Sequence, residues 1–144
     1  MVCINDVLEE LSDEIAFHPN TERLNINIKI DKKVEILGNT SLISSIFRNL
    51  MENAFAYSGG KNIYISLLEN TETEYILRFE DDGMGVANEH LDHLFERFYR
   101  VDKGRSRKAG GTGLGLAIVK HAVLFHNGKI SATNRPNGGL RFDF

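Results

Sequence analysis

Glycine alternates with other residues directly before an apolar segment of helical spacing, since residues 110–120 read Gly-Gly-Thr-Gly-Leu-Gly-Leu-Ala-Ile-Val-Lys. Gly111, Gly113 and Gly115 carry no Cβ, so the chain can turn steeply there and a ligand can come close to the main chain. The helix expected behind them offers unpaired N–H groups and the positive end of its dipole. The stretch therefore predicts an anion site, and phosphate is the obvious anion.

Two asparagines and a tyrosine follow one another at helical spacing within a second expected helix. Asn49, Asn53 and Tyr57 stand at i, i+4 and i+8, so they share one face. Asparagine is a poor former of helix interiors, and its amide oxygen is a hard, neutral ligand that suits Mg²⁺. The pair indicates a ligand for the amides; the alternative is that both are solvated or cap a neighbouring loop.

Two carboxylates and two glycines follow an expected strand in the segment Asp81-Asp82-Gly83-Met84-Gly85. A carboxylate at this place can accept a hydrogen bond from the exocyclic amine of adenine, and the glycines let the base approach the backbone. The alternative is a plain turn, because Asp-Gly is a common turn dipeptide. An EF-hand is excluded, since the spacing of the acids around Gly83 does not match its loop.

A basic loop, residues 95–113, precedes the glycine run. Its cations are Arg97, Arg100, Lys103, Arg105, Arg107 and Lys108. Such a loop can fold over a triphosphate, with Phe95 and Phe98 as apolar anchors, and arginine suits phosphate oxygens. A solvated loop or a patch for a protein partner is the alternative. The glycine spacing differs from the dinucleotide fingerprint, and the chain has neither a Walker A motif nor the motifs of eukaryotic-type protein kinases.

The elements that must position these groups follow from periodicity and turn chemistry. We expect helices at 4–17, 42–57, 88–94 and 114–125, and strands at 24–30, 34–37, 63–68, 75–80, 129–133 and 140–144. This order predicts an α/β (α+β) sandwich, in which about three helices cover one face of a mixed, mostly antiparallel sheet. Strand alternation leaves the other face polar, and the ligand lies between the helices and the long loop.

Composition limits the chain to a single domain over residues 1–144. Hydrophobic residues make up 42% and charged residues 26%, which is globular usage. The net charge of −3 does not favour nucleic acid, and the single cysteine, Cys3, suits a reducing compartment. No apolar run approaches the roughly 20 residues of a membrane span, so we expect no direct membrane contact and a cytoplasmic location, although the parent protein could be anchored in a membrane.

These segments, in this order, resemble the ATP-binding catalytic domain of bacterial sensor histidine kinases. Residues 49–58 resemble the N box, 81–85 the G1 box, 95–102 the F box, 111–116 the G2 box, and 137–144 the final glycine box with its strand. The resemblance covers nearly the whole chain, and the pairing of its F and G2 boxes is highly specific. It implies the Bergerat fold, ATP and Mg²⁺ as cofactors, and protein-histidine kinase activity.

The resemblance also implies roles for individual residues. Asn53 corresponds to the Mg²⁺-binding asparagine, Asp81 to the adenine-reading aspartate, and Arg100 to a lid arginine that reaches toward the terminal phosphates. Asn49 and Arg100 are the implied catalytic residues. The implied nucleotide-binding residues are Asn49, Asn53, Tyr57, Asp81, Gly83, Gly85, Phe98, Arg100, Gly111, Thr112, Gly113, Leu114, Gly115 and Leu116.

Three departures from the family pattern stand out. Ala56 occupies the place of a phosphate-contacting lysine, for which Arg97 or Lys103 could compensate, and Asp82 replaces an asparagine, a change that we expect to be without consequence. The phosphoacceptor motif is absent from the sequence, so the expected partners are the dimerisation domain of a parent kinase and, indirectly, a response regulator. An anti-sigma-factor serine kinase, or a degenerate module that binds ATP only to transmit conformation, is the alternative.

Overall fold

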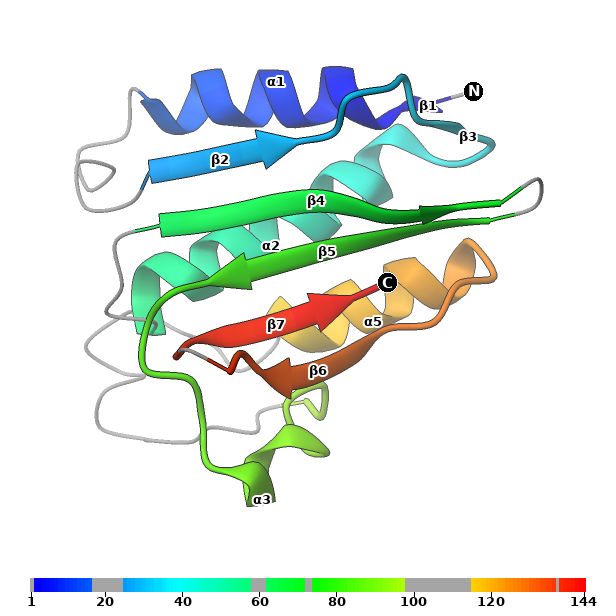
Figure 1. The fold of residues 1–144 in the computed structure, drawn as a ribbon. Coiled ribbons are helices and arrows are strands. Elements are labelled where there is room, and N and C mark those ends of the chain that lie inside the picture. Colours follow the sequence, from blue (N-terminus) through cyan, green and yellow to red (C-terminus); the bar gives the residue numbers. More distant parts are fainter. Residues whose placement is uncertain (1, 17–24, 58–61, 72–73, 98–114, 137) are drawn as a thin grey trace.

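The chain folds into a sheet with helices packed against one of its faces (Figure 1). The structure, a computed structural model, describes residues 2–16, 25–57, 62–71, 74–97, 115–136 and 138–144. The main sheet has five strands in the order β2-β4-β5-β7-β6, and two further strands, β1 and β3, pair with each other. This is the α/β sandwich that the order of elements predicts.

The main sheet is mixed and mostly antiparallel, which confirms the prediction. Only β2 and β4 run parallel, while β4–β5, β5–β7 and β6–β7 are antiparallel. The strands are β2 (Asn25–Lys29), β4 (Asn62–Asn70), β5 (Tyr75–Asp81), β6 (Ser131–Asn134) and β7 (Leu140–Asp143). β5 therefore lies at the centre of the sheet. Its last residue, Asp81, begins the segment 81–86, which we call the acidic turn.

Helices α1 (Ile4–Ala16), α2 (Thr40–Tyr57) and α5 (Gly115–Phe125) form the covering layer. The start of α2 is capped by Asn39, whose side-chain oxygen accepts the N–H of Leu42 at 3.1 Å. The backbone N–H of Asn39 in turn donates to Nε2 of His126 at 3.0 Å, and the ring's Nδ1 lies 2.7 Å from the carbonyl oxygen of Ala122. His126 thus joins the C-terminal end of α5 to the start of α2.

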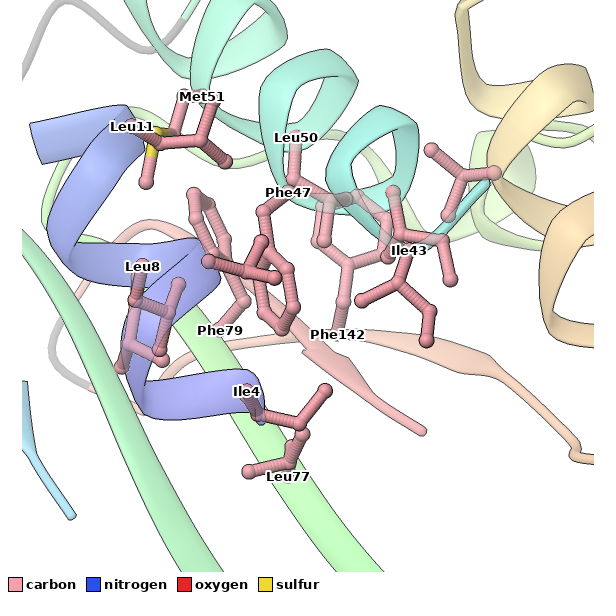
Figure 2. Close-up of a cluster of buried hydrophobic side chains, with 14 of the residues drawn as sticks. Ile4, Leu8, Leu11, Ile43, Phe47, Leu50, Met51, Leu77, Phe79 and Phe142 are labelled. Atoms are coloured by element: carbon pink, nitrogen blue, oxygen red, sulfur yellow. The ribbon is translucent and has the colours of Figure 1, made fainter. Parts of the chain in front are cut away.

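The core lies between the three helices and the sheet (Figure 2). Its largest fully buried side chains include Phe47 from α2, Phe79 from β5 and Phe142 from β7. Ile4 and Leu8 from α1 close the same cluster. Buried apolar residues recur at helical spacing along α1 and at alternate positions along β5 and β7. This pattern places the helix layer against the inner face of the two strands.

The outer face of the sheet is polar, as strand alternation predicts. Arg78 on β5 pairs side by side with Asp143 on β7, and Nε of the arginine donates to the carboxylate at 2.7 Å. Glu80 accepts from Arg141 at 3.3 Å and from Arg135 at 3.0 Å. These ion pairs join β5, β7 and the turn after β6, so the outer face carries cross-strand electrostatic contacts.

Some local expectations need correction. The strand expected at residues 34–37 is the two-residue β3 (Glu35–Ile36), and it pairs with β1 (Val2–Cys3), which the sequence gives no reason to expect. The helix expected at 88–94 ends early, as α3 (Asn88–Leu91). After α5, Asn127 takes the left-handed conformation, with a φ of 61°, a geometry that asparagine tolerates.

Candidate nucleotide-binding site

Asp81 ends β5 with its carboxylate turned into the protein. The residue is 3% exposed, and it is the one buried acid among the described residues. Its Oδ1 accepts the backbone N–H of Gly83 at 3.0 Å and that of Leu140 at 3.3 Å. Burial raises the pKa of Asp81 above its ordinary value of 3.8, although these two N–H groups oppose the shift. A buried acid with a raised pKa marks a candidate binding site.

Two glycines are required where the turn after β5 meets the β6–β7 hairpin. Gly139 has a φ of 105°, and a Cβ built on it would lie 1.9 Å from the carbonyl oxygen of Asp81. Gly85 has a φ of 67°, and its Cβ would lie 2.6 Å from Oδ1 of Asn134. Both positions combine a left-handed backbone with close contact, so only glycine fits without strain. The hairpin therefore holds the backbone of the acidic turn directly.

Asn134 makes the second contact between the hairpin and the turn. Its Oδ1 accepts the N–H of Val86 at 3.0 Å, and its Nδ2 donates to the carbonyl oxygen of Val86 at 2.6 Å and to Oδ1 of Asn88 at 3.1 Å. No sequence pattern points to Asn134. An asparagine at the end of a short strand gives no signal by itself, and its partner stands 48 positions away in the chain.

Asp82, which stands where the family pattern has asparagine, also has a defined place. Its Oδ1 accepts the backbone N–H of Asn62 at 2.8 Å, and its Oδ2 accepts the side-chain amide of Asn62 at 2.9 Å. Asn62 begins β4, which follows α2 in the chain. The carboxylate of Asp82 therefore ties the acidic turn to the chain that leaves α2, the helix that carries the two asparagines (Figure 1).

Asn49 lies where α2 meets the start of α5. Its Nδ2 donates to the carbonyl oxygen of Ser45 at 2.8 Å. Its Oδ1 faces Gly115, the first residue of α5, so closely that a Cβ on that glycine would lie 3.3 Å from it. The structure thus brings together two residues that the sequence assigned to one site. It also gives Gly115 a packing reason, because a side chain there would crowd Asn49.

Asn53 stands one turn after Asn49 on the same face of α2, as the i, i+4 spacing predicts, and it is half-buried. The backbone of Tyr57 ends the same helix. Leu116 packs against the hydrophobic core, so its side chain supports the start of α5 from within. In the ranges that the structure describes, no three His, Cys, Asp or Glu side chains converge on a metal-sized site; an assignment of Mg²⁺ here must rest on Asn53 and a phosphate ligand.

Part of the predicted site lies outside the described residues. This holds for Phe98, Arg100, Gly111, Thr112, Gly113 and Leu114, and for the side chain of Tyr57. What the structure does place is the acidic turn at the end of β5 and the amide of Asn49 at the start of α5. These two features can serve the two ends of a nucleotide, since one offers a buried acceptor and the other borders a helix N-terminus.

The fold is that of the ATP-binding domains of sensor histidine kinases. The chain matches the mycobacterial sensor histidine kinase MprB with a TM-score of 0.83 and 22% identity, over 99% of this chain and 93% of that one. It matches the NMR structure of the histidine kinase domain of the E. coli osmosensor EnvZ with a TM-score of 0.68 and 30% identity, over 99% and 84%. Both likenesses extend over practically the entire chain.

The chain belongs to the family of histidine kinase-, DNA gyrase B- and HSP90-like ATPases, whose model matches residues 38–144. Among curated relatives, the sensor-like histidine kinase SenX3 of Mycolicibacterium smegmatis is 38% identical over 141 residues. This match spans 95% of the chain but only 36% of SenX3. Within the described ranges, every helix is too short or too polar to reach across a bilayer.

Proposed function

We propose that this chain is the ATP-binding catalytic domain of a sensor histidine kinase, which binds Mg-ATP and presents the γ-phosphoryl group to a histidine on a separate dimerisation domain. The observation that carries the proposal is Asp81, a buried carboxylate at the end of a central strand in a chain of this family. The names of the relatives support the kinase class, since SenX3, MprB and EnvZ are all histidine kinases. We also propose a cytoplasmic location, where ATP is available.

Asp81 binds the adenine base of the nucleotide. Both hydrogen bonds that its carboxylate accepts from described residues go to Oδ1, which leaves Oδ2 to accept the exocyclic amine of adenine. In a buried setting, a charge-assisted bond of this kind contributes more than a neutral one. Gly83 and Gly85 keep the backbone beside the base free of side chains, so the ring can lie against the turn.

The phosphates bind at the start of α5, beside Asn49 and Asn53. The amide of Asn49 borders Gly115, where the first N–H groups of α5 have no partner within the helix. Asn53 lies one turn along α2 and would supply an amide oxygen to Mg²⁺, which neutralises phosphate charge when bound. By the family motifs, Tyr57 and Phe98 line the nucleotide, Arg100 reaches the terminal phosphates, and residues 111–116 form the hinge of the lid.

The reaction is an in-line phosphoryl transfer that depends on positioning and charge neutralisation. A ring nitrogen of the acceptor histidine forms a bond to the γ-phosphorus, the bond from that phosphorus to the bridging oxygen breaks, and ADP leaves with the electron pair. The amide of Asn49 has no useful basicity near neutral pH. It cannot activate water, so transfer to histidine prevails over hydrolysis.

Two measurements test the proposal. Calorimetric titration of the 144-residue chain with ATP, with and without Mg²⁺, should give one site per chain and tighter binding with the metal. Mixing the chain with a dimerisation domain from its parent kinase should then yield an acid-labile, base-stable phosphohistidine. Brisk ATP hydrolysis by the chain alone would contradict the proposed class, and phosphoserine on an anti-anti-sigma-type partner would assign the chain to the serine kinases.

A further inference from the structure

We propose that Asn134 is a positioning residue for the adenine site, because it holds the turn that carries Asp81 from the opposite strand. This inference rests on the proposed function and goes beyond the motifs that led to it. Asn134 ends β6, an edge strand, and its position is paired with Leu140 on β7. Its hydrogen bonds within the described part of the chain go to Val86 and Asn88 and to neither carboxylate of the acidic turn, so it acts on the nucleotide through the backbone of that turn.

The amide of Asn134 takes the place of a strand partner for Val86. The β5–β7 ladder ends at the pair of Glu80 and Arg141, so the backbone of Val86 lies beyond it. The side chain of Asn134 offers both an acceptor to the N–H of Val86, at 3.0 Å, and a donor to its carbonyl oxygen, at 2.6 Å. The half-buried Val86 thereby has both its backbone N–H and its carbonyl oxygen bonded, as a residue inside a sheet would have.

The surrounding bonds fix the orientation of this amide. Nδ2 has two acceptors, the carbonyl oxygen of Val86 and Oδ1 of Asn88, whereas Oδ1 faces a backbone N–H. A flipped amide would place donor against donor at one end and acceptor against acceptor at the other. Only asparagine offers this donor and acceptor at this reach, since serine is too short to span both groups and aspartate lacks the donor.

The turn is therefore held at both of its ends by the same hairpin. At the Asp81 end, the N–H of Leu140 reaches the carboxylate and Gly139 packs against the carbonyl group. At the other end, Asn134 holds Val86. Gly83 and Gly85 lie between these anchors, and glycine has the greatest backbone freedom to lose. Without Asn134, the hairpin holds the turn only at its Asp81 end, while the bonds between Asp82 and Asn62 remain. The glycine-containing segment up to Val86 then loses its far anchor, and the orientation of Asp81 toward the base is less well defined.

The test compares ATP with inosine triphosphate, in which a carbonyl group replaces the exocyclic amine. Wild-type protein should prefer ATP because Asp81 accepts from that amine. Asn134→Ala should bind ATP roughly 5- to 30-fold more weakly, the factor that corresponds to about 1–2 kcal/mol. The ratio of the affinity for ATP to that for inosine triphosphate should also fall, because a less ordered turn weakens the bond between Asp81 and the adenine amine. The backbone amide of Val86 should exchange with solvent at least about tenfold faster.

Asn134→Asp keeps the shape and the bond from Val86 N–H but sets an oxygen against the carbonyl oxygen of Val86, so it should behave like Asn134→Ala. This second variant preserves the test should the alanine variant not fold. Thr133→Ala, an exposed change on the same strand, is the matched control and should leave the ratio unchanged. A folded Asn134 variant with the wild-type ratio of affinities would overturn the inference. Wild-type protein without any preference for ATP would instead overturn the proposed role of Asp81.

Discussion

Replacing Asp81 with asparagine should weaken nucleotide binding without lowering the stability of the fold. The variant keeps an oxygen that can accept from the N–H groups of Gly83 and Leu140, so the turn should keep its shape. It removes a charge from a site that is 3% exposed, where burial raises the pKa of the carboxyl group. The protein environment therefore favours the neutral form, and Asp81→Asn should be at least as stable as wild type at pH 7.

Nucleotide binding should change in the opposite direction. The variant loses one charge-assisted hydrogen bond to the adenine amine, which contributes about 1.5–3 kcal/mol, or about 10- to 150-fold in affinity. With its oxygen held by Gly83 and Leu140, the new side chain turns its NH₂ group toward the adenine amine, and two donors form no bond. Calorimetry with ATP and thermal melting of the same samples measure both quantities. Asp31→Asn, which changes an exposed acid between β2 and β3, is the control and should change neither.

The pH dependence follows from the direction of the shift. Because the folded-state pKa of Asp81 lies above its ordinary value of 3.8, wild type gains stability from the protonated acid at low pH and loses it as pH rises through the folded pKa. Asp81→Asn lacks this term, so its stability relative to wild type should increase over the same interval. Unchanged ATP affinity in a folded Asp81→Asn protein would refute the adenine role, and a variant clearly less stable at pH 7 would refute the electrostatic reasoning.

Three further predictions concern contacts and residues of the same fold. Gly139→Ala places a Cβ 1.9 Å from the carbonyl oxygen of Asp81 at a φ of 105°, so urea denaturation should show a loss of at least about 2 kcal/mol. Gly38→Ala places a Cβ 2.5 Å from the ring of His126 and should cost about 1–3 kcal/mol; adding His126→Ala should relieve part of this loss in a double-mutant cycle. Arg100→Ala should slow phosphoryl transfer more than it weakens ATP binding, and equal losses would make it an affinity contact alone.

The sequence predicts the main elements because their patterns are long and periodic. The alternation in residues 75–80 predicts β5, and the spacing in 42–57 predicts α2 and the shared face of Asn49 and Asn53. The same regularity predicts the inner and outer faces of the sheet. The pairing of β1 with β3 escapes this reasoning, because a strand of two residues has no period to detect.

In the candidate site, too, local patterns are predictable and contacts between distant residues are not. The place of Asp81 at the end of a strand is predictable, because the alternation in residues 75–80 stops there and Gly83 and Gly85 follow shortly after. The contacts that hold it are not, since the bond between Leu140 and Asp81 joins positions 59 apart and that between Val86 and Asn134 joins positions 48 apart. Local patterns carry no information on which side chain meets which peptide group across such a separation. The same holds for the packing of Gly115 against Asn49, because it depends on how α2 and α5 lie against each other.

The hold of the β6–β7 hairpin on the acidic turn has a consequence for the order of folding. A chain that has formed α1, α2, β4 and β5 has Asp81 in place and the bonds of Asp82 to Asn62, but it lacks the contacts that the hairpin makes with the turn, because these come from Asn134, Gly139 and Leu140. Contacts between such distant positions close slowly. Nucleotide affinity should therefore arise late, once β7 has entered between β5 and β6. Bound ATP would then stabilise the hairpin by mass action, and amide exchange in β6 and β7 would slow as the nucleotide concentration rises.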